Sequence, residues 1–366
     1  DILKKALGFN PKSIEILNSL GRLYHEMRES KKAEKYFLKA LEINSNSFQL
    51  VNNIAGFYRE EGKYKLSVKY YEKAINLNPN SPSIINNLAK SYFDLNELNL
   101  SEKFCLKALS LNDKDENVRK ILSFVYLKKH NFELGWKYFD GRLKLSDFVD
   151  KNASINKLRP KIYHKNTLDI NTNLLVLREQ GVGDEILYSS MYGDLLNKIS
   201  KVKIECDPRL INLFKNSFPD HSNKFVELGY ISNNDEKLKS IKNIIFAGSL
   251  GKFFRKDIDS FLENNFLYAN KTLFYKHKKD LKKYDSKFKI GISWKSFKNR
   301  YADEKSLNLH DFNILIKNKK CVFFNIQYGD VKDEIKNNNK KYGYHIHTLE
   351  DLDIYNDFDN LAAFLT

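Results

Sequence analysis

The sequence contains few of the residues that cross-link a chain or interrupt its secondary structure. Its 366 residues include 3 Cys, 6 Pro and 15 Gly. Cys105, Cys206 and Cys321 lie far apart in the chain, which excludes a disulfide framework and a Cys-x-x-Cys metal site and fits a reducing cytoplasm. So little Pro and Gly excludes collagen-like and low-complexity chains. No apolar run reaches the ~18 residues of a membrane-spanning helix, so we expect a globular protein with about two to three domains.

The charge is strongly unbalanced, with 62 basic and 46 acidic residues and a net charge of +16. Such a charge suits nucleic acid or an anionic membrane surface. Most lysines are interleaved with Asp and Glu, however, so we expect no basic face and no nucleic-acid partner. The dense run KHKKDLKK at 276–283 is typical of a solvated helix or linker. Its alternative is contact with a phosphorylated substrate or with anionic lipid, which would place the protein at the inner face of the membrane.

A period of 34 residues runs through the first 145 residues. Small residues recur at Gly21, Ala55, Ala89 and Ser123 and at Ala40, Ala74 and Ala108, and Tyr recurs at Tyr24, Tyr58, Tyr92 and Tyr126. This pattern resembles the tetratricopeptide repeat, in which small residues lie where two antiparallel helices touch and a residue such as Pro79 ends a repeat. The resemblance implies an all-α solenoid over residues 1–145 whose groove binds a protein or peptide.

The two ends of this repeat region depart from the pattern. The fourth repeat is degenerate because Gly135 and Arg142 stand at small-residue positions. Ala6 and Pro11 are typical of the tail of an earlier repeat, and Asp1 is not an initiator Met. We therefore expect the chain to begin inside a longer protein.

Two neighbouring positions of the repeat are rich in Asn. They hold Asn18, Asn52 and Asn86, and Ser19, Asn53 and Asn87. A carboxamide both donates and accepts, so a regular row can pair with the backbone of an extended peptide of any sequence. The row resembles the Asn ladder in the repeats of O-linked N-acetylglucosamine transferase and predicts a peptide groove; the alternative is that Asn is simply abundant in this chain.

After a predicted linker at 146–170, short apolar runs alternate with helical patterns. The predicted strands are 173–177, 202–206, 224–228, 243–248, 289–294 and 321–329, and the predicted helices are 185–199, 209–217 and 308–318. This alternation predicts parallel sheets in a three-layer α/β arrangement.

Local motifs in this half resemble glycosyltransferase family 9, the lipopolysaccharide heptosyltransferase-like family. They are LLVLREQGVGDEIL, GISWKS, DEKSLNLHDF and FNIQYGD. The chain resembles bacterial proteins that join such a domain to tetratricopeptide repeats. This resemblance implies a GT-B fold with an acceptor-side Rossmann-like domain at 171–285 and a donor-side domain at 286–366. The donor half of the family continues with a Ser/Asp-rich loop and a His, so ending at Thr366 predicts an incomplete donor domain.

The resemblance also implies an activity, the inverting transfer of a sugar from a nucleoside diphosphate to a protein or glycan acceptor, without a metal or other cofactor. Asp184 matches the family's general base, and Gly181 and Gly183 allow close approach of the backbone to a ligand. Glu179 is the alternative base. Asp184 could instead only cap the following helix. The competing function is a protein-interaction scaffold whose transferase-like domain is inactive.

The leaving diphosphate requires positive charge. Lys305 matches the donor-phosphate Lys of the family, with Ser293, Lys295, Ser296 and Arg300 on the preceding strand end and loop. The alternative is that Lys305 is one solvated Lys in a Lys-rich chain.

Several other motifs do not carry a function in our interpretation. GSLGK at 248–252 has too few residues between its glycines for a phosphate-binding Walker loop. The Asp-x-Asp triplets at 257–259, 351–353 and 357–359 and the pair His345 and His347 do not make a metal site. Trp294 is expected to form core or cleft wall rather than a stacking platform.

Overall fold

A computed structural model describes residues 1–145, 161–163, 167–230, 239–261, 263, 265–297, 306–343 and 345–366. Most of the predicted linker at 146–170 lies outside these ranges. The chain divides into two compact units. The first unit joins the N-terminal helices to a short later segment, Gly251–Phe261, and the second contains the rest of the α/β part.

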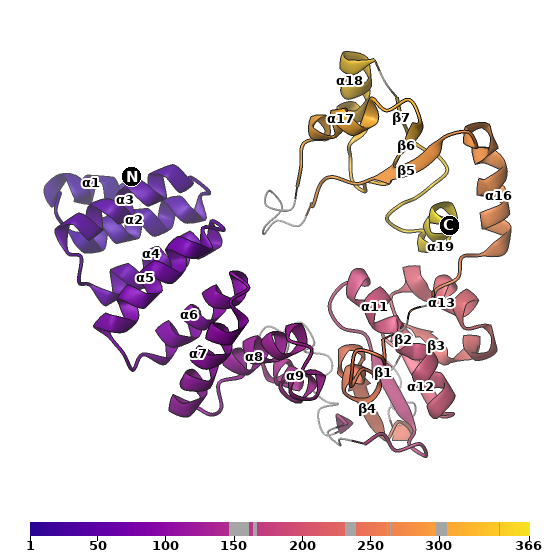
Figure 1. Cartoon of the computed structure of the whole chain (residues 1–366), viewed down its shortest axis with the longest axis horizontal. Helices are drawn as coiled ribbons and strands as arrows, with labels where there is room; N and C mark the ends of the chain where they lie inside the picture. Colours follow the sequence, from indigo (N-terminus) through magenta and orange to yellow (C-terminus); the bar gives the residue numbers. More distant parts are fainter. Residues whose placement is uncertain are drawn as a thin grey trace. The chain divides into compact units, whose positions relative to one another are not determined.

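The first unit is a series of antiparallel helix pairs (Figure 1). Its helices are α1 (Ile2–Phe9), α2 (Ile14–Glu26), α3 (Ser30–Ile43), α4 (Phe48–Glu60), α5 (Tyr64–Leu77), α6 (Pro82–Asp94), α7 (Leu98–Leu111), α8 (Glu116–Lys128) and α9 (Phe132–Phe139), followed by the 3-10 helix η1 (Asp140–Lys144). Helices α4, α6 and α8, each the first of its pair, also contact one another in sequence. The 34-residue period correctly predicted this helical solenoid.

Small residues let the two helices of a pair approach closely. Ala40 and Ala74 are completely buried. A Cβ atom at Gly21 would lie 2.6 Å from the ring of Phe37, so no larger residue fits there without movement of that ring. The repeated small residues thus act by leaving space for an aromatic side chain of the partner helix.

The turn between the two helices of each pair has a repeated backbone conformation. One residue in each turn has a positive φ, and these are Arg28 (60°), Gly62 (70°), Asn96 (64°) and His130 (58°), spaced by 34 residues. The next amide donates to the carbonyl of the repeat's Tyr, as from Lys63 to Tyr58 at 2.8 Å. The left-handed residue therefore ends the first helix in the manner of a C-cap.

Successive repeats are joined by one pair of positions. His25 lies 3.7 Å from Glu60, and Arg59 lies 2.7 Å from Asp94. At the third junction Lys128 lies over the ring of Phe93, 5.1 Å from its centroid. Each pair links a residue to the one 35 positions later, so the same geometric position carries a His–Glu contact, an Arg–Asp ion pair and a cation–π contact at successive junctions.

The short segment Gly251–Phe261 packs against the last helix pair of the solenoid. It contains α15 (Gly251–Phe254), and Nε1 of Trp136 in α9 donates to the carbonyl of Arg255 at 2.6 Å. Lys252 forms an ion pair with Asp140 at 2.9 Å. A Cβ at Gly251 would lie 2.5 Å from the Trp136 indole. This contact explains why Gly251, the second glycine of the GSLGK motif, is a glycine although the motif is not a phosphate-binding loop.

The second unit contains two parallel sheets. The first has the order β3-β2-β1-β4 and the second the order β5-β6-β7. Their strands are β1 (Leu174–Leu177), β2 (Val202–Cys206), β3 (Phe225–Glu227), β4 (Asn243–Phe246), β5 (Phe288–Ile292), β6 (Cys321–Asn325) and β7 (Ile346–His347). All described pairings are parallel, with Leu174 opposite Val202 and Phe288 opposite Cys321. The predicted α/β class is confirmed.

Short helices connect these strands. They are α11 (Val182–Ser189), α12 (Tyr192–Lys198), η3 (Pro208–Leu210), α13 (Ile211–Ser217), η4 (Pro219–Lys224), η5 (Ala247–Leu250), α16 (Lys271–Leu281), η6 (Lys282–Tyr284), η8 (Leu309–Phe312), α17 (Asn313–Ile316), α18 (Lys332–Tyr342) and α19 (Phe358–Leu365). The single helix predicted at 185–199 is wrong, because the chain breaks between α11 and α12. This break lets Met191 and the completely buried Tyr192 reach the core.

The lysine-rich run lies mostly on α16, as a solvated helix would. Its lysines are exposed, but His277 is buried, with its Nε2 2.7 Å from Oδ1 of Asn360 in α19. Asn216 of α13 donates to Asp359 at 2.8 Å. Helix α19 therefore packs on both α13 and α16 within this unit.

Candidate functional site

The five predicted Asn side chains all lie on first helices of the repeats, α2, α4 and α6. We call the surface formed by α2, α4, α6 and α8 the first-helix face. Nδ2 of Asn53 donates to Oδ1 of Asn18 at 3.1 Å. In contrast, Oδ1 of Asn52 and Oδ1 of Asn86 are buried and have no hydrogen-bond partner among the described residues. The row is therefore only partly satisfied from within the protein, whereas Ser19 is exposed.

A second candidate site lies at the carboxyl end of the first sheet. The strand order places β2 and β4 on opposite sides of β1, so the loops after β1 and β4 diverge at a topological switch point, where α/β folds place ligands. Glu179, in the loop after β1, is buried, and its Oε1 accepts from the amide of Gly248 after β4 at 2.6 Å. Glu179 thus links the two loops that border this point.

Asp184 lies in the first turn of α11 and caps it. Its Oδ2 accepts from the amide of Gly181 at 3.1 Å. The helix begins at Val182, three residues earlier than predicted, so Asp184 is the third helical residue and not the residue before the helix. Gln180, just before the cap, has a φ of 64°, and an added Cβ at Gly183 would meet nothing within 4 Å. Internal packing therefore does not require a glycine at 183.

A buried ion network surrounds this edge. Arg178 Nη2 lies 2.6 Å from Glu185 Oε1, and Arg178 Nη1 lies 3.4 Å from Asp207 Oδ2. Arg209 completes the network with two short contacts to Asp207. Burial raises the pKa of Glu185 to about 6, whereas the hydrogen bond from Arg209 lowers the pKa of Asp207. Burial also raises the pKa of Glu205.

Backbone amides at this edge are already bound by carboxylates of the chain. Glu179 binds the amide of Gly248 at 2.6 Å, Asp184 that of Gly181 at 3.1 Å, Glu185 that of Asp207 at 2.9 Å, and Glu205 that of Gly229 at 3.0 Å. Such loop amides are what commonly bind phosphate in α/β folds. Because carboxylates occupy these four amides, they are not available to a phosphate.

Arg178, Glu185, Asp207 and Arg209 were not predicted as members of this network. A signal was present for three of them, because Arg178, Asp207 and Arg209 come within three residues of the end of β1 or β2, where charged residues meet at the carboxyl edge of a parallel sheet. Glu185 lies on α11 and had no such signal. Periodicity does not reveal which carboxylate is paired with which Arg, since the partners come from different strands.

In the second sheet, Gln327 organises the loop after β5. Its Oε1 accepts from the hydroxyl of Ser293 at 3.0 Å and from the amides of Trp294 and Lys295 at 2.8 and 2.7 Å. Lys295 Nζ forms an ion pair with Glu334 at 2.6 Å. The amide of Ser296 donates to Ser306 Oγ at 3.0 Å. Ser293, Lys295 and Ser296, three of the predicted donor-side residues, are thus held by partners within the chain.

The remaining donor-side residues, Arg300 and Lys305, lie outside the described residues. Trp294 is buried in the apolar cluster of this sheet, so its assignment to the core was correct.

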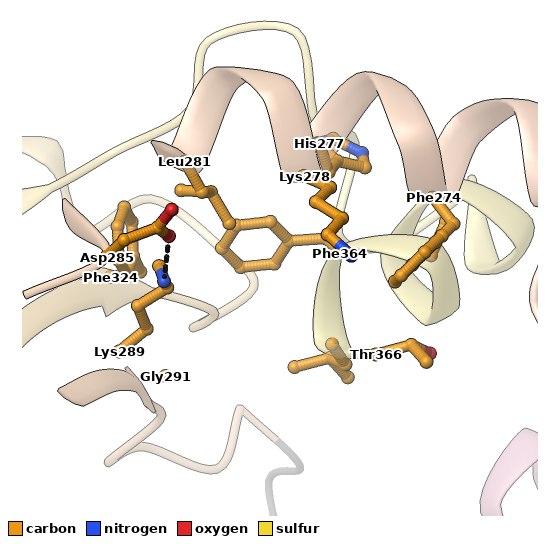
Figure 2. A pocket seen from close by; sticks show the side chains of 12 residues that line it. Phe274, His277, Lys278, Leu281, Asp285, Lys289, Gly291, Phe324, Phe364 and Thr366 are labelled. Atoms are coloured by element: carbon orange, nitrogen blue, oxygen red, sulfur yellow. Dashed lines mark hydrogen bonds and ion pairs between the residues drawn. The ribbon is translucent and has the colours of Figure 1, made fainter. Parts of the chain in front are cut away.

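A pocket of about 430 Å³ lies between α16, β5 and α19, and Figure 2 shows the ring of Phe364 between Leu281 and Phe274 there. Its wall includes His277 and the ion pair of Lys289 with Asp285, 2.9 Å apart. None of the predicted site residues lines this pocket.

The other sequence motifs have local structural roles. Asp353 accepts from the amides of Tyr355 and Asn356, and Asp357 caps α19. The rings of His345 and His347 meet edge to face, with their centroids 4.5 Å apart. Across the described ranges, no group of three His, Cys, Asp or Glu side chains is arranged to hold a metal ion. Nor do the described helices include one of sufficient length and apolarity to span a bilayer.

Comparison with known proteins identifies the N-terminal repeats. A profile described as "TPR repeat" matches residues 57–96, and one described as "Tetratricopeptide repeat" matches 14–47 and 82–115. The chain is 26% identical to "Protein FlbA" of Caulobacter vibrioides over 209 residues, which covers 52% of this chain and 34% of that protein. The chain thus spans about a third of the length of this curated relative.

Solved structures similar to this chain include MamA, with a TM-score of 0.36 and 19% identity over 41% of this chain and 86% of that one. PilF of Pseudomonas aeruginosa gives a TM-score of 0.35 and 22% identity over 43% and 82% of the two chains. YrrB, titled "a TPR protein with an unusual peptide-binding site", gives 0.35 and 18% over 44% and 84%. The helix pairs within residues 14–115 are therefore tetratricopeptide repeats by their family matches, and repeats of this kind indicate interaction with proteins.

Proposed function

We propose that the first-helix face binds an extended polypeptide through the carboxamides of Asn18, Asn52 and Asn86. The observation that carries this proposal is the pair of buried oxygens, Oδ1 of Asn52 and of Asn86, without a hydrogen-bond partner among the described residues. A buried polar atom without a partner costs about 1–3 kcal/mol. A backbone N–H of a bound peptide would supply the donor.

The three carboxamides would not play the same part. The oxygen of Asn18 accepts from Asn53, so one of its two acceptor lone pairs is already used. The oxygens of Asn52 and Asn86 have no partner among the described residues and offer a peptide both lone pairs. These carboxamides would bind the backbone of the peptide and not its side chains. We therefore expect the groove to bind peptides of many sequences.

The test uses the whole chain and a random 12-residue peptide library displayed on phage. Selected peptides are synthesised, and their affinity is measured by fluorescence anisotropy for wild type, for Asn52→Ala with Asn86→Ala, and for Asn76→Ala. Asn76 is the matched control, because it is exposed on the second helix α5. At about 1 kcal/mol per lost hydrogen bond, the double variant should bind about 30-fold more weakly and the control should bind normally.

A second measurement separates function from folding. Removing an unpartnered buried oxygen removes its desolvation cost, so the double variant should unfold at the same or a higher temperature than wild type. Equal peptide affinity in the double variant and wild type would refute the Asn row as the binding element.

The α/β unit has a second candidate function, the transfer of a sugar from a nucleoside diphosphate to a protein or glycan acceptor. Four loop amides at the carboxyl edge of the first sheet are bound by carboxylates, and such an edge suits a hydroxyl-bearing acceptor. This arrangement favours the transferase function. In this proposal Asp184 is the general base, with Glu179 as the alternative. Gly183 leaves space for the acceptor, because no atom of the described residues lies within 4 Å of a Cβ built there.

The nucleotide side of this proposal depends on Lys305 and Arg300. Lys295 is paired with Glu334, so it is less suited to the leaving diphosphate than an unpaired cation would be. The alternative remains a protein-interaction scaffold with an inactive transferase-like domain.

Turnover of a panel of nucleoside diphosphate sugars tests this second function. Asp184→Asn keeps an oxygen that can accept from the Gly181 amide but removes the base. Turnover should fall about 100-fold or more while the unfolding temperature changes little. Glu179→Gln is the comparison. Turnover that Asp184→Asn leaves intact would mean that Asp184 serves only as a helix cap.

A further inference from the structure

The first-helix face has three rows of equivalent positions spaced by 34 residues. They are Asn18, Asn52, Asn86 and Lys120; Arg22, Gly56, Lys90 and Phe124; and His25, Arg59, Phe93 and Leu127. Within one helix these positions are spaced by four and then three residues, so they share a face. The Asn row thus ends at Lys120, and Lys90 lies one turn after Asn86 on the same face.

The acidic groups near these lysines already have partners. Asp94 is bound by Arg59 at 2.7 Å, with both side chains only 21% exposed. Glu60 lies 3.7 Å from His25. Lys90 and Lys120, in contrast, form no ion pair with any residue in the part of the chain that the structure describes.

The surroundings of Lys90 disfavour its own charge. The Lys90 side chain is exposed, yet its pKa is lowered, first by desolvation from nearby protein atoms and then by the positive charge of Arg59, with a smaller contribution from Lys120. Asp94 and Glu60 oppose this shift without cancelling it. A negative group placed beside Lys90 would therefore be favoured electrostatically.

The row that contains Lys90 has no side chain at its second position. Gly56 stands there, between Arg22 and Lys90. Among the described residues, a Cβ at Gly56 would make ordinary contact with the hydroxyl of Tyr71 in α5, at 3.4 Å. No side chain of residue 56 therefore lies between Arg22 and Lys90 in this row.

We propose that the peptide bound on the first-helix face carries acidic side chains, which Lys90 and Lys120 bind while the Asn row holds the peptide backbone. This inference rests on the proposed peptide-binding function. It assigns the partner as an extended segment with Asp or Glu, and it places those residues toward the third and fourth repeats.

The same phage library tests this inference on the whole chain. Peptides selected on wild type should be enriched in Asp and Glu relative to the unselected library. Replacing these acids with Asn and Gln in a synthetic peptide should weaken binding about 5- to 30-fold, and the Lys90→Gln, Lys120→Gln double variant should lose the same factor. Lys107→Gln, which changes an exposed Lys on the second helix α7, should retain it.

The outcomes distinguish the two proposals. If wild type enriches no peptide, peptide binding itself is wrong. Enrichment of peptides with Asp and Glu at library frequency would leave peptide binding intact but overturn the acidic assignment. An equal loss in Lys107→Gln would attribute the preference to overall charge, and displacement of the peptide by an equal concentration of a 20-nucleotide single-stranded DNA would reassign the face to nucleic acid.

Discussion

The Glu185 side chain has partners within the fold, but burying its charge costs free energy. Its carboxylate is completely buried, yet it is contacted by Arg178 and by the amide of Asp207. Burial prevails over these partners and raises its pKa to about 6 from an ordinary value near 4.5. The folded state therefore binds this proton more tightly than the unfolded state does.

This shift predicts a pH dependence of stability. The stabilisation from the protonated Glu185 is fully present below pH ~4.5 and is lost as the pH rises through about 6, a loss of about 2 kcal/mol. Glu185→Gln should flatten the unfolding free energy between pH 4.5 and 6.5, measured by urea denaturation. Asp207 acts in the opposite direction, because its pKa is lowered, and only at more acidic pH. A variant as pH-dependent as wild type would show that another group titrates.

At the scale of the element, the repeated turn distinguishes two glycines of one repeat. Gly62 has a φ of 70°, where a side chain is strained, whereas Gly56 lies inside α4, where an added Cβ would make ordinary contact with the Tyr71 hydroxyl at 3.4 Å. A side chain is therefore strained at position 62 but compatible with the helical backbone at position 56.

Gly62→Ala should therefore destabilise the protein by about 1 kcal/mol, and Gly56→Ala should stabilise it by a similar amount through helix propensity. Thermal unfolding of both variants checks this, each acting as the control for the other. Destabilisation by both would mean that the Tyr71 hydroxyl cannot move away from a side chain at 56.

The elements were largely predictable from the sequence, and their connections were less so. Apolar runs located β1 and β2, and the 34-residue period located the helix pairs, because both signals are local. Arg28 and His130 carry no sequence sign of their left-handed conformation; only their register with Gly62 reveals it. The 34-residue period correctly placed the five Asn residues on the first helices of the repeats, and their role in binding stays a prediction. The Arg178 network depends on side chains from separate elements, which periodicity does not pair.

At the scale of the molecule, each compact unit contains one of the two Trp residues. Trp136 belongs to the repeat unit, where it contacts Gly251 and the Arg255 carbonyl. Trp294 is buried in the second unit. Fluorescence of the two indoles can therefore report on the units separately.

Gly251→Ala should place a methyl group against the Trp136 ring and destabilise that contact by about 1–3 kcal/mol. In a Trp294→Phe background, the remaining emission should shift to the red at lower urea concentration than in the same background with Gly251. Gly183→Ala is the matched control, since its added Cβ meets nothing within 4 Å. An unchanged transition would show that the indole moves aside without cost.

The segment that covers Trp136 is also made late. The Arg255 carbonyl lies 119 residues after Trp136, and a ribosome adds about 5–20 residues per second, so this partner is synthesised roughly 6–24 s after the helix it covers. During that interval Trp136 and Phe132 lack their later neighbours, the Arg255 carbonyl and the ring of Phe261. The last helix pair of the repeats therefore reaches its full set of contacts only after Phe261 has been synthesised.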